Sequence, residues 1–167
     1  MRRRISPQLA VAIALLAVIL LSNLLAPVIA PYDPNAIDMA ARLEGPSAAH
    51  WLGTDTLGRD MLSRVLYGGR SSILLALAAT VLSMTLGLIL GTLAGYFGGA
   101  CDFAITACAN IFQGLPGTCL MIAIAGILGP GIGNLLIALV VTSWAGFSRV
   151  VRTETLRIRE QSYMEGL

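Results

Sequence analysis

Three long stretches of this chain carry no charged residue. They extend from Ile5 to Tyr32, from Ser71 to Ala100 and from Phe103 to Ser148. A helix that crosses a lipid bilayer needs about 20 mostly apolar residues, and its backbone polar groups must find their hydrogen bonds internally. Charged residues make up 12% of the whole chain, against about 25% in a typical soluble domain. These stretches therefore predict an all-α membrane protein.

The lengths of the uncharged stretches predict four transmembrane helices. The first two stretches can each hold one helix, and the third is long enough for two. Within the third, LGPGIGN at 128–134 predicts a turn, because Gly and Pro interrupt helices and Asn often begins one. The first apolar run exceeds the roughly 7–15 residues of a cleaved signal peptide, which predicts a retained anchor. The four predicted helices occupy residues 9–29, 72–96, 103–128 and 132–150.

Arginine placement predicts the orientation, because cytoplasmic segments of membrane proteins are enriched in basic residues. With the N-terminus inside, seven of the eleven arginines fall on the cytoplasmic side. These seven are Arg2, Arg3, Arg4, Arg149, Arg152, Arg157 and Arg159. The predicted organisation has cytoplasmic segments at 1–8, 97–102 and 151–167 and extracytoplasmic segments at 30–71 and 129–131.

The stretch HWLGTDTLGRD at 50–60 lies in the predicted extracytoplasmic segment and contains three charged residues, Asp55, Arg59 and Asp60. Leu57, Met61 and Val65 recur at intervals of four, which places them on one face of a helix. This spacing predicts a short amphipathic helix over about 56–67, suited to the membrane surface or to another subunit.

The polar residues of that stretch are predicted to have structural roles. Asp55 or Thr54 can cap the short helix, and Asp60 and Arg64 can form an ion pair across one helical turn. His50 is the only histidine, and no second ligand accompanies it at a spacing typical of a metal site. The stretch therefore predicts neither catalysis nor metal binding.

The three cysteines also predict no metal site and no disulfide framework. Cys101 and Cys108 lie about 10 Å apart along a helix axis at 1.5 Å per residue, too far to share one ion, and Cys119 lies farther still. Their odd number and apolar setting are typical of small buried side chains. We expect no catalytic residue and no bound cofactor.

Glycines mark two features within the predicted spans. Gly87, Gly91 and Gly95 are spaced by four and share one helix face, which allows close packing of helices in lipid. A substrate passage lined by small residues is the alternative that the pattern leaves open. The sequence GLPG at 114–117 predicts a kink or break, which serves either structure or transport.

Four motifs, in order, carry a family resemblance. They are PYDP at 31–34, HWLGTDTLGRDMLSRVLYGGRSS at 50–72, GTLAGYFGG at 91–99 followed by Asp102, and W-x-x-[FY]-x-R-x-V-R at 144–152. Together they resemble the C-type permease subunit of ABC importers in the dipeptide, oligopeptide and nickel group, with some likeness to nickel permeases.

The resemblance implies a bacterial inner-membrane subunit with six spans, of which this chain supplies four. It implies four kinds of contact: a second homologous permease, two cytoplasmic ATP-binding subunits, an extracytoplasmic solute-binding protein and the lipid bilayer. Nucleic acid is not an expected partner. The chain lacks the G-x-x-x-x-G-K-[ST] loop that binds nucleotides, so ATP hydrolysis is expected on partner subunits rather than here.

The resemblance also assigns site residues. The extracytoplasmic family motif comprises Gly53, Asp55, Gly58, Arg59, Asp60 and Arg64. The loop that couples to an ATPase begins at REQSYMEGL, with Glu160, Tyr163, Met164, Glu165 and Gly166 at its start. Gly166 and Leu167 replace the two alanines of the family pattern, so the chain is expected to be truncated within the coupling loop. Arg149 and Arg152 mark the cytoplasmic boundary, where they anchor the topology or contact the ATPase.

Two other functions are alternatives to an importer permease. A truncated, non-transporting four-span protein with a structural or regulatory role is the first alternative. An intramembrane enzyme is the second, and the predicted spans show no buried acid, histidine or Ser–Lys pair to support it.

Overall fold

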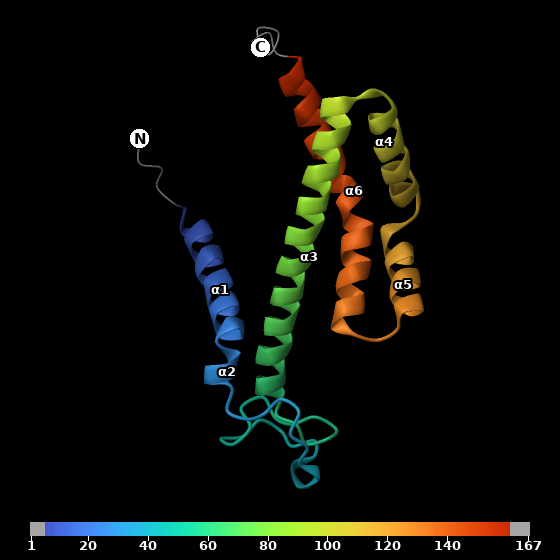
Figure 1. The fold of residues 1–167 in the computed structure, drawn as a ribbon. Coiled ribbons are helices and arrows are strands. Elements are labelled where there is room, and N and C mark those ends of the chain that lie inside the picture. Colours follow the sequence, from blue (N-terminus) through green and yellow to red (C-terminus); the bar gives the residue numbers. More distant parts are fainter. Residues whose placement is uncertain (1–5, 161–167) are drawn as a thin grey trace. The chain divides into compact units, whose positions relative to one another are not determined.

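A computed structural model describes residues 6–160, and within these the chain is helical and contains no strand. The helices are α1 (Pro7–Leu24), α2 (Ala26–Ile29), a 3-10 turn η1 (Met39–Ala41), α3 (Met61–Phe97), α4 (Gly99–Gly114), α5 (Gly117–Leu128) and α6 (Ile132–Arg159) (Figure 1). The predicted fold class, an all-α membrane protein, is confirmed. The chain divides into two units, one up to Leu74 and one from Leu75 onward.

Three of the described helices, α1, α3 and α6, are long and apolar enough to cross a membrane, and α4 with α5 can form a fourth, broken span. Their apolar side chains are largely exposed: α1 contains no buried residue. Such helices are stable in hydrocarbon, where exposed Leu, Ile and Val side chains meet lipid tails.

The first unit joins α1 and α2 to the beginning of α3. Ser6 caps α1, with its hydroxyl accepting a hydrogen bond from the Leu9 amide at 3.3 Å. Near the other end of α1, the side chain of Asn23 packs against the backbone of Gly69 in α3. The Tyr32 amide donates a hydrogen bond to the Ser63 hydroxyl at 3.2 Å. The end of the α1–α2 apolar run therefore lies against the first turns of α3.

The start of α3 corrects one prediction. The separate amphipathic helix expected over about 56–67 does not form: residues 56–60 are non-helical, and the helix from Met61 continues without a break to Phe97. The reason is that no proline separates the amphipathic turns from the apolar run, and the arginine between them, Arg70, is compatible with a helix, so one set of helical hydrogen bonds extends through both.

The second unit contains the rest of α3 with α4, α5 and α6. Helix α6 packs against both α4 and α5. The buried core of this unit is small: Trp144 and Ala145 of α6 pack against Ala109 of α4. The rings of Phe112 and Trp144 meet edge to face, with centroids 5.7 Å apart.

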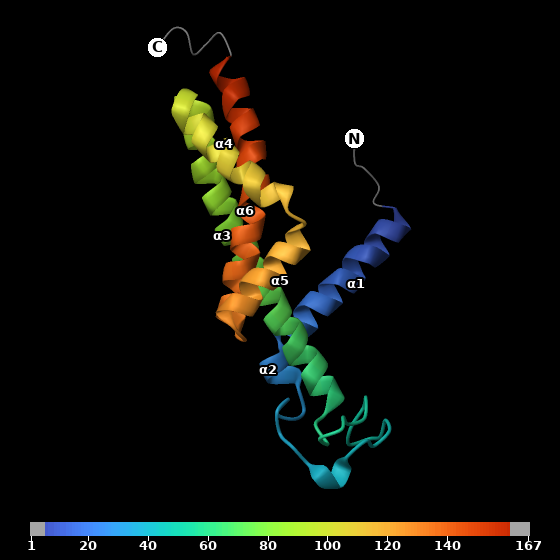
Figure 2. The same ribbon diagram turned by 90° about the vertical axis from the view of Figure 1, so that its right-hand side faces the viewer.

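A sharp bend separates α4 from α5, at an angle of 91° (Figure 2). Pro116 lacks an amide hydrogen and forces Leu115 into an extended conformation, with φ −93° and ψ 143°. The predicted break at GLPG is thus confirmed, and it divides the predicted third span into α4 and α5. The cytoplasmic turn predicted at 97–102 is shorter than expected, because α4 already begins at Gly99.

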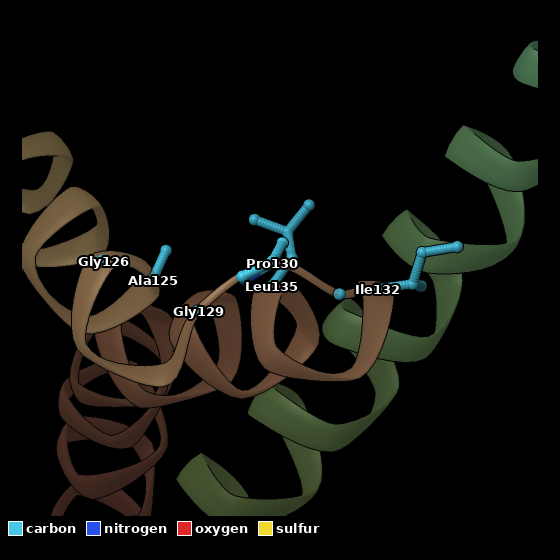
Figure 3. A pocket seen from close by; sticks show the side chains of 7 residues that line it. Ala125, Gly126, Gly129, Pro130, Ile132 and Leu135 are labelled. Atoms are coloured by element: carbon cyan, nitrogen blue, oxygen red, sulfur yellow. The ribbon is translucent and has the colours of Figure 1, made fainter.

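The turn between α5 and α6 is built from glycines in conformations that other residues rarely adopt. Gly129 has φ 81° and Gly131 has φ 149°. The Asn134 side chain donates to the carbonyl oxygens of Leu128 at 2.8 Å and Gly129 at 3.2 Å, which closes the turn. An apolar hollow of about 560 Å³ lies at this turn, lined by Ala125, Gly126, Gly129, Pro130, Gly131, Ile132 and Leu135 (Figure 3).

Candidate functional site

The end of α6 leads directly into the segment predicted to contact an ATPase. The helix continues nine residues past the predicted boundary at Val150 and ends at Arg159, with Glu160 as its exposed C-cap. The other predicted coupling residues, Tyr163, Met164, Glu165 and Gly166, lie outside the described residues, as do Arg2, Arg3 and Arg4. The candidate site is therefore the set of contacts that fixes this end of α6.

An ion pair joins α6 to α4. Asp102 lies in the first turn of α4, where the helix dipole favours a negative charge. Arg152 of α6 approaches both carboxylate oxygens: its Nη2 donates to Oδ2 at 2.6 Å, and its Nε donates to Oδ1. The Thr106 hydroxyl adds a third hydrogen bond to Oδ1 at 3.0 Å. A bidentate arginine–carboxylate pair fixes orientation as well as distance, so α4 and α6 are held in register here.

Two further arginines of α6 make contacts on either side of this pair. Arg149 donates to the Asn110 side-chain oxygen of α4 at 2.8 Å. Arg159 donates to the carbonyl oxygens of Gly95 and Tyr96 at 3.3 and 3.2 Å. Carbonyl groups in the last turn of a helix have no partner within the helix and favour a positive charge. Arg149, Arg152 and Arg159 thus attach the last three turns of α6 to both α4 and α3.

The same two helices, α3 and α6, approach closely along the glycine face. A Cβ atom added to Gly87 would lie 2.5 Å from Phe147, and one added to Gly91 would lie 2.5 Å from the Ser148 carbonyl oxygen. One added to Gly95 would lie 2.7 Å from an α6 side chain. Since real Cβ contacts are essentially never shorter than 3.0 Å, this spacing of α3 and α6 requires glycine at all three positions. We call this contact the α3–α6 seam.

Small residues continue the seam toward the start of α3. Ala79 and Ser83 extend the spacing of four, and both are buried. Among residues 6–160, the Ser83 hydroxyl has no hydrogen-bond partner. A cavity of about 270 Å³ lies beside them, lined by Ala76, Ala79, Thr80, Ser83, Leu139, Ser143 and Phe147.

In the first unit, the family-motif residues gather around Asp55. Its Oδ1 accepts from the amides of Leu57 at 2.8 Å and Arg59 at 3.0 Å, and its Oδ2 accepts from the Arg59 Nε at 2.8 Å and from Arg64. Burial alone would raise the pKa of Asp55, but the hydrogen bonds and charge of Arg59 and the Leu57 amide outweigh it and hold this pKa well below its usual range. Asp55 is thus a fixed anion that organises the turn.

Asp60 begins α3 and binds the only histidine. Its Oδ2 accepts from the Ser63 amide at 2.7 Å, which makes Asp60 the N-cap, and its Oδ1 lies 3.0 Å from the His50 Nδ1. Burial would raise the pKa of Asp60, yet the Ser63 amide and His50 lower it. The rings of Tyr32 and His50 are in tilted contact, with their centroids 4.9 Å apart and an angle of 37° between their planes.

Two sequence predictions about these groups are therefore wrong. Asp60, rather than Asp55 or Thr54, caps the helix, and Arg64 pairs with Asp55 rather than with Asp60. The Asp60 carboxylate turns toward the amides at the helix end and toward His50, so it is unavailable to the side chain one turn later.

Gly53 and Gly58 complete the turn through backbone conformation. Their φ angles are 74° and 73°, in the left-handed region that glycine adopts readily. A Cβ atom at Gly58 would also overlap the backbone of Asp38. Among residues 6–160, no group of three His, Cys, Asp or Glu side chains could hold a metal ion.

Sequence reasoning missed the pairs His50–Asp60, Asp55–Arg64, Asp102–Arg152 and Asn110–Arg149. The only available signal was that Asp102 and Arg152 belong to two of the four motifs that occur together. Nothing in the spacing of residues indicated which charges would meet.

The sequence matches one family profile and several curated proteins. The sequence profile described as "Binding-protein-dependent transport system inner membrane component" matches residues 87–167. The nickel transport system permease protein NikC of Escherichia coli (strain K12) is 41% identical over 134 residues, which cover 80% of this chain and 48% of that protein. The probable D,D-dipeptide transport system permease protein DdpC of the same strain is 38% identical over 160 residues, 96% of this chain and 54% of its own length.

A third relative extends the match to nearly the whole chain. The glutathione transport system permease protein GsiD of Pectobacterium atrosepticum is 38% identical over 166 residues, 98% of this chain and 55% of its own length. The chain spans about half the length of these curated relatives. It belongs to the family of inner membrane components of binding-protein-dependent transport systems.

Proposed function

We propose that this chain is a transmembrane permease subunit of a binding-protein-dependent ABC importer, in which it forms half of the translocation path and couples to a cytoplasmic ATPase. The observation that carries the proposal is its similarity, over 80–98% of its length, to relatives named as permeases for nickel, D,D-dipeptides and glutathione. The proposed cargo is a dipeptide, an oligopeptide or nickel.

The attachment of α6 supports the coupling role. A force applied at Glu160 and beyond would reach α4 through Arg152 and Asp102, and α3 through Arg159. The α3–α6 seam would carry it along the helices, because closely packed backbones cannot move independently without opening a void. Arg149 and Arg152 thus act as positioning residues, and the coupling segment itself comprises Glu160, Tyr163, Met164, Glu165 and Gly166.

The proposed topology places the N-terminus in the cytoplasm of a bacterium, with α1, α3, the α4–α5 pair and α6 crossing the inner membrane. Residues 30–60 then lie outside, and the end of α6 lies inside. The contact of Arg159 with Gly95 and Tyr96 supports this order, because it brings the ends of α3 and α6 to the same side. In this topology α3 is the second crossing and α6 the fourth. Both therefore run in the same direction, which requires their C-terminal ends to lie on the same side.

Reporter fusions after residues 60 and 160 test the topology. An alkaline phosphatase fusion should be active at residue 60 and inactive at residue 160, and a fluorescent reporter that folds only in the cytoplasm should show the reverse. The same result at both positions would contradict the proposed crossings.

The proposed partners are a second homologous permease, two ATP-binding subunits and an extracytoplasmic solute-binding protein. Co-expression of this chain with the permease and ATPase subunits of its own system tests them directly. We expect the ATPase to co-purify with the chain, and Glu165→Arg to lower its recovery several-fold. Glu154→Arg is the control, since Glu154 is exposed on α6 and precedes the coupling segment.

Three outcomes separate the alternatives. Loss of the ATPase with Glu165→Arg alone supports coupling. Equal recovery with both variants would place the contact elsewhere and overturn the assigned residues. A stable chain that recovers no ATPase in any variant would favour the non-transporting alternative.

A further inference from the structure

The segment between α2 and α3 largely buries two carboxylates and exposes several large apolar side chains, and four further charged residues, Asp33, Asp38, Arg42 and Glu44, lie at its surface. The side chains of Asp55 and Asp60 are 11% and 1% exposed. By contrast, five large apolar side chains of the segment are each more than half exposed: Ile37, Met39, Leu43, Trp51 and Leu52. Trp51 is the most exposed of them, at 72%. Several exposed large apolar side chains on one short segment favour a contact with an apolar or amphipathic phase.

Part of this segment is a well-ordered hairpin, residues 43–55, which we call the Trp51 hairpin. Main-chain hydrogen bonds join Leu43 to Asp55 at 3.1 Å and Thr54 to Glu44 at 3.0 Å, and Ser47 to His50 at 2.8 Å across the turn. Leu43, Trp51 and Leu52 are therefore presented by a hydrogen-bonded backbone.

Leu43 has an unusual backbone conformation. It is the only non-glycine residue with positive φ, at 56°, within residues 6–160. A bulky side chain rarely adopts this conformation, and here it does so while its side chain remains 61% exposed. The hydrogen bond from the Leu43 amide to the Asp55 carbonyl oxygen holds this conformation and keeps the side chain directed outward.

The hairpin is attached at the level where the apolar helices end. His50 binds Asp60, the N-cap of α3, and stacks on Tyr32, which follows the α1–α2 apolar run by two residues. The Tyr32 amide in turn binds Ser63 in the first turn of α3. Trp51 is the next residue after His50, so it emerges close to the boundary between hydrocarbon and water.

We propose that the Trp51 hairpin lies in the headgroup layer of the same bilayer that its helices cross, with Trp51, Leu52 and Leu43 in contact with phospholipid. Tryptophan is enriched at membrane–water interfaces, where its ring meets apolar chains and its N–H meets polar groups. Lipid is the favoured occupant because the hairpin is attached to two helix ends at that boundary. This inference depends on membrane insertion and not on the proposed transport function.

Fluorescence tests the proposal, because the chain contains two tryptophans. The variant Trp144→Phe leaves Trp51 as the single emitter. The full chain is reconstituted into phosphatidylcholine–phosphatidylglycerol vesicles that carry nitroxide labels either at the headgroup or deep in the acyl chain. We expect blue-shifted emission, quenching several-fold stronger from the headgroup label than from the deep label, and weak quenching by iodide in the water phase.

Trp51→Phe is the matched control and leaves Trp144, which is 6% exposed and packs on Phe112. Its emission should respond weakly to iodide and to the headgroup label. If Trp144→Phe does not fold, the difference between the wild-type and Trp51→Phe spectra isolates the signal of Trp51.

Two results would overturn the proposal. Strong quenching by iodide, without quenching by lipid labels, would show that the hairpin stands in water. Protection from iodide without quenching by either lipid label would show that protein covers Trp51 instead.

Discussion

The segment around Asp55 and the α3–α6 seam are held together by opposite means. Around Asp55, carboxylates and hydrogen bonds form the interior and apolar side chains face outward. Along the seam, glycine, alanine and serine let two backbones touch, and large apolar side chains face outward as well. Neither region has a large buried apolar core within residues 6–160, so hydrophobic burial within the chain explains neither.

This comparison identifies what replaces a hydrophobic core. In lipid, association of helices gains little from the hydrophobic effect and depends on close packing and polar contacts. Around Asp55, largely buried ion pairs and backbone hydrogen bonds take the place of a core. The predictions below change one region at a time to separate these two mechanisms.

The largest effect is expected at the centre of the seam. Gly91→Ala places a methyl group where a Cβ would lie 2.5 Å from the Ser148 carbonyl oxygen. Forced separation of α3 and α6 should destabilise the protein by about 2 kcal/mol, measured as a lower thermal midpoint by circular dichroism in detergent.

Gly133→Ala is the control for that variant. Gly133 lies in α6 with no atom within 4 Å of its added Cβ. Because alanine favours a helix by up to about 1 kcal/mol over glycine, this variant should be unchanged or more stable. Equal losses in both variants would show that the seam does not depend on close approach.

Acid should affect the other region. The pKa of Asp55 is lower in the folded chain than its ordinary value, so its ionised form stabilises the fold above that ordinary value. This stabilisation is lost as the pH falls through the folded pKa. Below about pH 4, amide exchange corrected for intrinsic rates should accelerate in residues 43–59 and remain slow along the seam.

Asp55→Asn should remove this acid dependence. The amide cannot accept the charge-assisted bonds of Arg59 and Arg64, so protection of residues 43–59 should already be reduced at neutral pH. An acid transition of unchanged size in this variant would assign the effect to another carboxylate, with Asp60 the next candidate since its pKa is lowered too.

A smaller effect is expected from the ion pair between α4 and α6. Asp102 and Arg152 are 22% and 29% exposed, so a double-mutant cycle with Asp102→Asn and Arg152→Gln should give a coupling energy of about 1 kcal/mol. Glu154 and Arg157, which are 58% and 71% exposed, should give a coupling close to zero. Equal coupling for the two pairs would remove the support for a positioning role of Arg152.

Effects no larger than that of the ion pair should come from two buried serines of α3, one in each region. Ser63 accepts the Tyr32 amide at 3.2 Å, whereas the Ser83 hydroxyl has no partner. Ser63→Ala should cost about 1 kcal/mol, and Ser83→Ala should be neutral or slightly stabilising. Chemical denaturation of both variants measures the difference, and a reversed order would mean that the seam depends on a hydroxyl contact.

The sequence by itself determined the helical class, the apolar stretches and the break at Pro116. These features depend on the local properties of the chain: the length of an uncharged run, the period of its small residues and the missing amide of proline. It also placed Gly87, Gly91 and Gly95 on one face, because the helix period alone decides that.

Tertiary structure decided which groups meet. Asp102 and Arg152 are separated by fifty positions, and Asp60 has His50 rather than its helical neighbour Arg64 as a partner. It also decided that α6 covers the glycine face and that α3 begins at Met61 as one helix. Each of these outcomes depends on the path of the whole chain and on competition among several possible partners, which no local pattern records.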